Sequence, residues 1–530
     1  MKKRLLTFNG GLSTKLAPHL IEANQATECL NVDLTKGSLY PMKTHTHEVT
    51  TTGIYAMMED GVVIANTDPT DVRSYARFGG RIYWSNKTYG TFGLMRYNGT
   101  SAGVEAAAPP APDGSIAKGT PTANGNLSGD YIYAYTYIDT DGIESAPSGY
   151  SSIVTVSEQD VPMTITVATA IPADVVTIRV YRTGGNNPTF NLIAELPKVT
   201  LTFTDTTRDI DVSRIELASF ENSPPPVDLE HLVENSGTMW GSVGEKIYFS
   251  INGSPEYWNS LDYIPLNNPC TGIGTFGNLV IAFTRSGAYA ISGYSRDTVT
   301  LDKLPYREGC VNHGSIANVG DYLVWVSKNG VCVFDGNVVR VATRNLLSWN
   351  DLATVGELTW DDIPSTFDAN SGFDVVDGIS FQGKYYGVYN SGLGILQVED
   401  AVLASTISID NPHSIFYDDV NNYLTVVTED DGVFNTRSID TNSAQLAEAT
   451  WKTGQIQDEA YDVLKQYRRI RFDVAPLSVT IYTNDKEFTI KNKKDFFLPS
   501  GFTGNYIQMS ITTDKEIRSC TYEYGLLYNA

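Results

Sequence analysis

The stretch Gly320-Asp321-Tyr322-Leu323-Val324-Trp325-Val326-Ser327 decides the fold class of this chain, because a turn leads directly into a short apolar strand. The same pattern recurs at residues 79–85, 244–250, 277–284, 383–389 and 421–428. From residue 244 the spacings between these units are 33, 43, 63 and 38 residues, which straddle the period of about 40 to 50 residues typical of four-stranded propeller blades. A radial β-propeller leaves few exposed strand edges, so we predict that architecture. The widest gap contains residues 345–367, where we expect one helical or irregular excursion.

Two proline-rich stretches, residues 106–112 and 223–227, bracket a separate segment of the chain. Such stretches resist helix and central strand, so we interpret them as semi-rigid linkers. Between them, Tyr131, Tyr133, Tyr135 and Tyr137 alternate with small or aliphatic residues, which indicates a strand with one tyrosine face. Further short strands are predicted at residues 163–167, 176–181, 190–196 and 200–204. We therefore predict an inserted β-sandwich over 113–222, and its pattern resembles fibronectin type III-like modules inserted in phage structural proteins.

The regular spacing ends at Trp451, where a third, smaller domain is predicted. Strands are expected at residues 470–474, 479–483, 488–491, 506–511 and 518–524. This gives three domains: a discontinuous propeller over 1–112 plus 223–448, the insert over 113–222, and a C-terminal β-domain over 449–530. A basic cluster of Arg468, Arg469 and Arg471 precedes the first strand of the last domain. We interpret it either as an assembly contact through arginine–carboxylate pairs or as a solvated strand edge.

The composition excludes several classes of protein. The 530 residues include 38 Lys plus Arg and 61 Asp plus Glu, a net charge of −23 that argues against tight binding to nucleic acid through phosphate neutralisation. Aromatic residues make up 11% of the chain, which favours pleated sheets. The five cysteines include no C-x-x-C pair, so we expect free thiols and a reducing cytosol. We also expect no signal peptide and no transmembrane helix, because no apolar run is long enough.

No common catalytic or metal-binding motif is present. Residues 272–277 match G-x-G-x-x-G, but the motif precedes a strand rather than a helix, which favours turn glycines over a dinucleotide site. His45 and His47 are the one close histidine pair, and we interpret them as solvated loop residues. Asp139 and Asp141 suit either a turn or a calcium ligand set. We therefore expect no cofactor, no metal and no enzymatic activity.

The two ends of the chain carry a resemblance to a known family. The N-terminal elements are Asn9-Gly10-Gly11-Leu12-Ser13, Gln25-Ala26, Asn31-Val32-Asp33-Leu34 and Gly37-Ser38-Leu39-Tyr40-Pro41, and the C-terminal ones are Trp451-Lys452-Thr453-Gly454, Arg468-Arg469-Ile470 and residues 506–511. Together they resemble the tail nozzle, or tail tubular protein B-like, proteins of short-tailed bacteriophages. Lys43-Thr44 stand where those proteins commonly have Arg-Gly. The resemblance covers the ends and the overall architecture.

The resemblance implies a structural protein of the virion tail, assembled in the cytoplasm of a bacterial host. Such a hub or nozzle is a homohexameric tube below the portal and its adaptor, the head-to-tail connector. It conducts double-stranded DNA and docks tail fibres or spikes. A conduit must let DNA slide, and an acidic wall repels phosphates rather than trapping them. Six copies would carry 6 × (−23) = −138 formal charges.

A second hypothesis treats the propeller as a carbohydrate-binding or glycan-cleaving receptor-binding protein. It rests on surface aromatic residues and on Trp360, Asp361 and Asp362, where a carboxylate pair adjoins an aromatic residue suited to stacking on a sugar. Glycan binding or reducing-sugar release that Asp361→Asn abolishes would favour this alternative.

Overall fold

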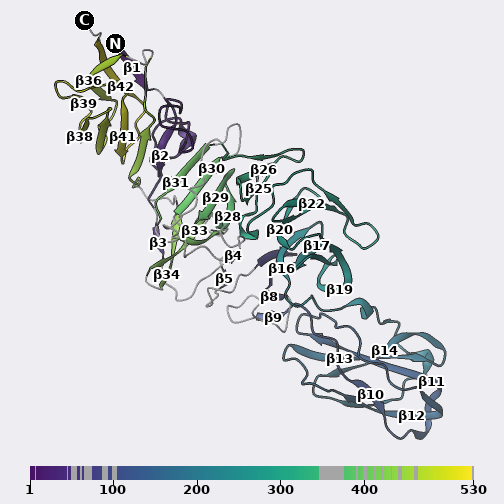
Figure 1. Cartoon of the computed structure of the whole chain (residues 1–530). Coiled ribbons are helices and arrows are strands. Elements are labelled where there is room, and N and C mark those ends of the chain that lie inside the picture. Colours follow the sequence, from purple (N-terminus) through teal and green to yellow (C-terminus); the bar gives the residue numbers. More distant parts are fainter. Residues whose placement is uncertain are drawn as a thin grey trace, which may run out of the picture.

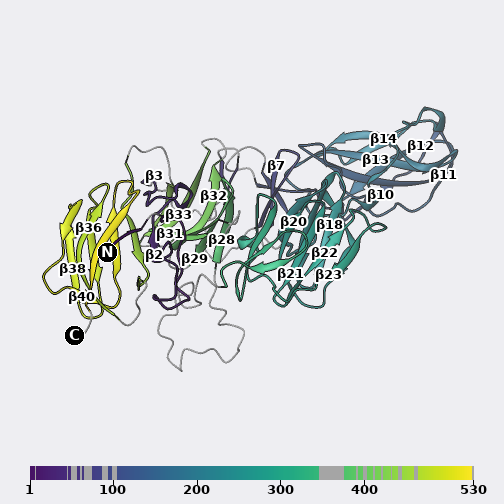
Figure 2. The same cartoon turned by 90° about the horizontal axis from the view of Figure 1, so that it is seen from above.

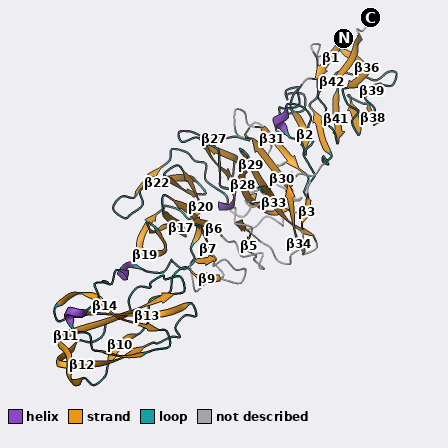
Figure 3. Ribbon diagram, turned by 180° about the vertical axis from the view of Figure 1, so that it is seen from behind, coloured by secondary structure: helices purple, strands orange, loops and turns teal. Residues whose placement is uncertain are grey.

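The chain is an elongated, almost entirely β protein. The computed structural model describes residues 1–5, 7–44, 46–48, 57–59, 62–64, 74–85, 94–97, 104–344, 375–389, 392–397, 403–409, 412–418, 422–430, 433–439, 445–458 and 463–527. Both termini lie at one end of the molecule and the insert lies at the other (Figure 1). The same order is seen from above in Figure 2. Within the described part, helix is limited to short 3-10 turns between the strands (Figure 3), such as η1 (Leu34–Lys36) and η5 (His313–Ser315).

The middle of the chain is a β-propeller built from sheets of four consecutive antiparallel strands. The first sheet comprises β6 (Ser74–Phe78), β7 (Arg81–Ser85), β8 (Met95–Tyr97) and β9 (Val104–Ala106). The next comprises β16 (Glu230–Asn235), β17 (Thr238–Val243), β18 (Lys246–Ile251) and β19 (Ser254–Pro265). It is followed by β20 (Cys270–Phe276), β21 (Leu279–Thr284), β22 (Gly287–Ser292) and β23 (Thr300–Lys303), and then by β24 (Ala317–Val319), β25 (Tyr322–Ser327), β26 (Gly330–Phe334) and β27 (Val339–Val341).

The last blades complete the series. One is made by β28 (Val375–Phe381), β29 (Lys384–Tyr389), β30 (Gly392–Gln397) and β31 (Leu403–Ile407), and the other by β32 (Pro412–Asp418), β33 (Tyr423–Asp430) and β34 (Val433–Ile439). The early strand β3 (Thr46–Glu48) adds to β34 as the fourth strand of that final sheet. The first strands of successive blades touch one another, from β6 through β16, β20, β24 and β28 to β32, and β32 contacts β4 (Met57–Glu59) of the hairpin that β4 forms with β5 (Val62–Ile64). A propeller is thus confirmed, with an N-terminal strand completing its last blade.

The recurring sequence unit marks the second strand of each blade. β7, β18, β21, β25, β29 and β33 all begin within three residues of a predicted unit. Each follows a residue with positive φ: Gly80, Gly244, Gly277, Gly320, Gly383 or Asn422. Glycine, and to a lesser extent asparagine, adopts this conformation at little steric cost, so the turn is the most regular part of the repeat.

The G-x-G-x-x-G stretch is an inner strand, not a nucleotide-binding loop. Residues 270–276 form β20, and only Gly277 occupies the turn that the sequence predicted for all three glycines. A Cβ at Gly272 or Gly274 would lie 2.8 or 2.7 Å from side-chain atoms of Ile316 in the next blade. These two glycines therefore permit close packing between neighbouring blades.

The insert is a two-sheet sandwich, as its sequence pattern predicted. Its strands are β10 (Ser115–Lys118), β11 (Thr122–Asp139), β12 (Val154–Thr166), β13 (Val175–Gly184), β14 (Asn187–Pro197) and β15 (Thr202–Asp205). The second half of β12 pairs with β10 and β15, whereas its first half pairs with β11, so β12 passes from one sheet to the other. The four tyrosines of β11 face the core between the sheets.

Serine side chains bind one edge of β11. The segment after β11 runs beside the strand without matching its spacing, because three residues of the segment cover the same length as two residues of β11. The backbone carbonyls of the segment therefore do not reach the N–H groups of these tyrosines. Serine hydroxyls accept these hydrogen bonds instead at 2.9–3.0 Å, in the pairs Tyr137–Ser145, Tyr135–Ser148 and Tyr133–Ser151. The serine N–H groups donate back to the same tyrosine carbonyls.

The two chain ends form one module, which corrects the predicted boundary. β1 (Lys2–Leu5) pairs with β42 (Cys520–Leu527), and β2 (Ala26–Leu30) pairs with β35 (Ala449–Thr453). Leu39 also pairs with Ile517, so the first 30 residues and the segment that follows them belong with the C-terminal strands and not with the propeller. The predicted C-terminal strands are present as β36 (Leu464–Phe472), β37 (Ser478–Tyr482), β38 (Glu487–Lys491), β41 (Gln508–Thr513) and β42, with the short β39 (Asp495–Phe497) and β40 (Thr503–Gly504) added to β36. We call residues 1–44 and 449–530 the terminal module.

A single nine-stranded sheet joins the propeller to the terminal module. It runs β28-β29-β30-β31-β2-β35-β41-β37-β38, and β31 meets β2 in parallel. Asn31 holds this junction: its N–H donates to the Thr406 carbonyl at 2.8 Å and its side-chain amide to the Glu448 carbonyl at 2.9 Å. Its φ of 56° is one that asparagine tolerates better than most residues.

Candidate functional site

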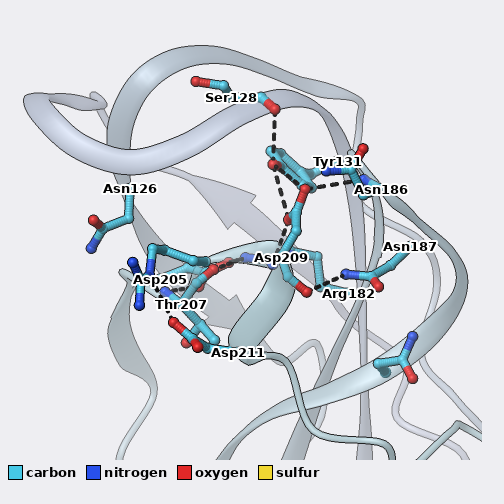
Figure 4. Close-up of polar contacts among 12 residues, drawn as sticks. Asn126, Ser128, Tyr131, Arg182, Asn186, Asn187, Asp205, Thr207, Asp209 and Asp211 are labelled. Carbon is cyan, nitrogen blue, oxygen red and sulfur yellow. Dashed lines mark hydrogen bonds and ion pairs between the residues drawn. The ribbon is translucent and has the colours of Figure 1, made fainter.

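A buried arginine organises one end of the insert (Figure 4). The strand β13 places Arg182 between Asp205, at the end of β15, and Asp209, in the segment after it. Its Nη1 lies 2.6 Å from Asp205 Oδ2 and its Nη2 lies 3.0 Å from Asp209 Oδ1. The guanidinium carbon also lies 4.8 Å from the centre of the Tyr131 ring. Because Arg182 is only 1% exposed, this is an ion-pair network in a low-dielectric environment.

The other polar groups of this network are also satisfied. Tyr133 donates its hydroxyl to Asp205 Oδ2 at 2.9 Å, and Tyr131 donates to Asp209 at 3.1 Å. Burial, and next the neighbouring carboxylates, raise the pKa of both phenols. The Asn186 N–H also donates to Asp209 at 3.0 Å. These hydrogen bonds and ion pairs fix the position of the chain that leaves β15.

A second buried ion pair joins the insert to the propeller. Arg96 on β8 places Nη2 2.8 Å from Asp139 Oδ2 and 2.9 Å from Asp141 Oδ2. Asp139 Oδ1 meanwhile accepts from the N–H groups of Asp141 and Ile143, which closes the turn. The sequence suggested that Asp139 and Asp141 belong either to a turn or to a calcium site. In the structure they lie in a turn, and Arg96 of the propeller neutralises their charge.

The junction has further contacts, which correct the expectation that the insert hangs on separate linkers. Tyr257 of β19 accepts the Glu144 N–H at 3.0 Å, and the Trp258 N–H of the same strand donates to the carbonyl of Ser223, in the second linker, at 2.9 Å. In the two proline-rich stretches Ala107, Ala108 and Pro225 are buried. The linkers therefore pack against the protein, and the insert is held in place.

Two of the three predicted assembly arginines already have partners within the chain. Arg469 and Arg471 on β36 flank Asp495 on β39, with Nε to carboxylate distances of 2.7 and 3.0 Å. Hydrogen bonds from these arginines, Arg469 first, lower the pKa of Asp495 to about 2. The Arg469 guanidinium also covers the exposed ring of Phe497. Arg468 is exposed, with its guanidinium beside Gly525.

A histidine pair connects neighbouring blades. The rings of His231, on β16, and His313, in η5, lie 5.1 Å apart. His231 Nδ1 is 2.7 Å from the Ser242 hydroxyl, and His313 Nδ1 accepts the Ile273 N–H at 3.3 Å. Burial lowers the pKa of His231 to about 4, and burial together with the charge of His231 lowers that of His313 to about 3. Both rings are therefore neutral at pH 7.

The described residues offer little for metal or redox chemistry. No three His, Cys, Asp or Glu side chains among them gather closely enough to hold a metal ion. All five cysteines are free and buried, and burial raises the pKa of each thiol. The described part also contains no helix long and apolar enough to cross a bilayer.

Several predicted residues cannot be placed in this arrangement. Trp360, Asp361 and Asp362 of the glycan hypothesis lie outside the described residues, as do His45 and the excursion expected over 345–367. Neither Arg96 nor Arg182 was predicted from the sequence as a functional residue. The only signal for Arg182 was a charged residue on the core-facing side of its strand, together with a carboxylate, Asp205, in the last strand of the insert, which pairs with β12. Nothing in the sequence around Arg96 indicated its ion pairs, because its partners lie more than 40 residues away in another domain.

Comparison with known proteins gives distant likenesses among solved structures. No protein family matches the chain, and no curated protein matches it. Among solved structures, apo AztD from Citrobacter koseri is 12% identical, covers 73% of this chain and 99% of its own, and has a TM-score of 0.27. The extracellular domain of a putative hybrid two-component system from B. thetaiotaomicron is 10% identical over 85% of this chain and 48% of its own, with a TM-score of 0.30. The β-propeller domain of Myceliophteria thermophila Cps50 (Swd1) is 11% identical over 49% and 92%, with a TM-score of 0.24.

Proposed function

We propose that this chain is a structural subunit of a bacteriophage tail hub or nozzle. Six copies form a tube that conducts double-stranded DNA during ejection, joins the portal-adaptor (head-to-tail connector) protein and docks tail fibres or spikes. The subunit is part of the virion tail, is assembled in the cytoplasm of the bacterial host, and performs no catalysis.

The observation that carries this proposal is the pairing of β2 with β35 and of β35 with β41, in which Ala26 lies opposite Thr453 and Trp451 lies opposite Ile511. The stretches that resemble tail nozzle proteins lie at opposite ends of the sequence. Their pairing brings these stretches together in the terminal module. A chance resemblance at two distant places would give no reason for the two stretches to fold together, so the pairing supports a common origin for both.

The residues that carry the resemblance also have demanding backbone roles. Gly11 and Gly37 adopt φ values of 70° and 66°, and Asn31 adopts 56° at the junction with the propeller. Other residues would be strained at these positions, so a fold of this kind would preserve them in sequence.

The way the parts are joined fits a subunit of a tube. The nine-stranded sheet couples the terminal module to the propeller, and the buried Arg96–Asp139 pair fixes the insert at the other end. A subunit that packs side by side with five copies must hold its domains in fixed relative positions. The net charge of −23 supports a conduit in which DNA slides without being trapped.

The test is the symmetry of the assembled protein. The full-length chain, concentrated to tens of micromolar, is examined by mass photometry and by class averages of negatively stained particles. We expect particles of six subunits with a six-fold ring in end-on views. Class averages that contain only monomers, or rings of another symmetry, would overturn the proposal.

A further inference from the structure

Charge is distributed very unevenly along this molecule. The terminal module contains 17 Lys plus Arg and 13 Asp plus Glu, a net charge of +4. Residues 45–448 contain 21 and 48 of these residues, a net charge of −27. A polyanion is therefore repelled by the propeller and the insert, and the terminal module is the part of the chain that it can approach.

Within the terminal module, three lysines stand out, and we call them the lysine patch: Lys491, Lys493 and Lys494. Lys491 ends β38, the last strand of the nine-stranded sheet, and the other two lie in the link to β39. All three side chains are exposed. Within the described part of the chain, no carboxylate or hydrogen-bond acceptor engages their ammonium groups.

The backbone that presents the lysine patch is fixed. The Asn492 N–H donates to the Leu477 carbonyl at 3.0 Å, and the Phe472 N–H donates to the Lys494 carbonyl at 2.8 Å. The adjacent carboxylate, Asp495, is already neutralised by Arg469 and Arg471. The positive charge of the patch is therefore available to a partner from outside the chain.

The composition of the patch favours phosphates over a protein surface. Lysine is depleted in protein–protein interfaces, because burying its flexible, strongly hydrated ammonium group is unfavourable. Phosphate backbones are contacted without dehydrating the ammonium group fully, and release of their counterions drives binding.

We propose that the lysine patch is a weak, sequence-independent contact for the phosphates of double-stranded DNA. The choice of DNA among anionic polymers rests on the proposed function. In that role the contact makes the two ends of the conduit different for DNA. DNA is attracted to the end that carries the terminal module and is repelled by the rest of the protein. The neutralisation of about three phosphates is weak enough to let DNA slide.

The test measures DNA binding by the assembled full-length protein. Fluorescence anisotropy of a labelled duplex of about 30 base pairs is recorded at low salt for the parent protein and for the triple variant Lys491→Gln, Lys493→Gln, Lys494→Gln. The matched control is Lys118→Gln, Lys303→Gln, Lys328→Gln, which removes the same charge from exposed positions of the insert and the propeller. We expect the patch variant to bind at least tenfold more weakly and the control to change less than threefold. Three phosphate contacts also predict that the parent loses about 20-fold in affinity between 50 and 150 mM salt.

A second measurement locates the contact without any substitution. Acetylation of lysines by an amine-reactive reagent, read by mass spectrometry, should slow at the three patch lysines when duplex DNA is added and should not slow at Lys118. Equal weakening of DNA binding by both triple variants, no binding at low salt, or patch-dependent binding to anionic phosphatidylglycerol vesicles but not to DNA would each overturn the inference. Mass photometry of the same samples keeps the two proposals apart: six-fold particles without patch-dependent DNA binding reject only the inference, and the absence of such particles rejects the proposed function.

Discussion

Arg96 of the propeller and Asp139 of the insert form an ion pair of 2.8 Å in which neither side chain is more than 1% exposed. Asp141, on the rim of the same junction, is 30% exposed and binds both Arg96 and Arg81. The insert is thus held by one buried and one half-buried carboxylate. A buried pair of this kind adds little to stability relative to apolar packing, but it is sensitive to the loss of one partner.

Arg96→Met should loosen the junction strongly. The substitution leaves Asp139 buried without its cation, a change that destabilises comparable sites by about 3–5 kcal/mol. We expect faster hydrogen exchange at residues 139–143 and faster proteolysis at residues 106–112. The control is Arg81→Met, which removes a partly exposed partner of Asp141 and should change stability by less than about 1 kcal/mol. Equal effects of the two substitutions would contradict the role of the buried pair.

The double variant Arg96→Met, Asp139→Asn tests the same pair from both sides, because the amide oxygen keeps an acceptor for the two N–H groups that close the turn while the charge is removed. Removal of both charges removes the desolvation penalty, so the double variant should be more stable than Arg96→Met alone. Additive losses would show that the two side chains do not act together.

Residues 113–222 should fold as an independent unit. The sandwich has its own core and its own buried arginine, and in isolation Asp139 becomes hydrated while its oxygen keeps the two backbone hydrogen bonds that close the turn. We expect a cooperative thermal transition followed by circular dichroism. A broad, non-cooperative melt would contradict the domain boundary.

Within that fragment, Arg182→Met should be among the most damaging substitutions. It leaves the buried Asp205 carboxylate without its cation and beside the partly buried Asp209, so we expect a loss of about 3–5 kcal/mol in the free energy of unfolding. Arg179→Met is the matched control: Arg179 lies three residues earlier on the same strand, pairs with Glu144 and Glu195, and is 29% exposed. Urea denaturation of the two variants makes the comparison, and a loss for Arg179→Met as large as for Arg182→Met would contradict it.

The sequence predicted the local features well and the distant ones poorly. The glycine turns and second blade strands follow from a few consecutive residues, and so do the tyrosine strand and the C-terminal strands. The pairing of β1 and β2 with the other end of the chain was missed, because β-pairing over more than 400 residues leaves no local pattern. The same holds for Arg96: nothing near Met95 or Tyr97 indicates that a propeller strand supplies the cation for a turn in another domain. The role of Gly272 and Gly274 depends on Ile316 of the next blade, so the motif alone suggested only turns.

The histidine pair predicts how the stability of the propeller depends on pH. His231 and His313 have folded-state pKa values of about 4 and about 3, below the value of 6.5 expected when unfolded. As pH falls from 6.5 to 4, the unfolded chain binds a proton at each of these two histidines and the folded chain does not. The two groups therefore lower the free energy of unfolding by up to about 2.7 kcal/mol per pH unit. Asp377 on β28 acts in the opposite direction, because burial raises its pKa to about 7 and the folded chain gains a proton there first.

Three variants separate these opposing contributions, measured by the denaturation midpoint between pH 7.5 and 4.5. Asp377→Asn removes the compensating proton, so its stability should fall more steeply with acid than that of the parent. His231→Asn and His313→Asn each keep an acceptor near the position of Nδ1, remain neutral, and should flatten the acid dependence by about one proton. His19→Gln, a substitution of an exposed histidine outside the propeller, is the control for the loss of an imidazole as such. If the two asparagine variants lose stability at every pH while keeping the parental slope, the pair is structural but does not determine the acid sensitivity of the propeller.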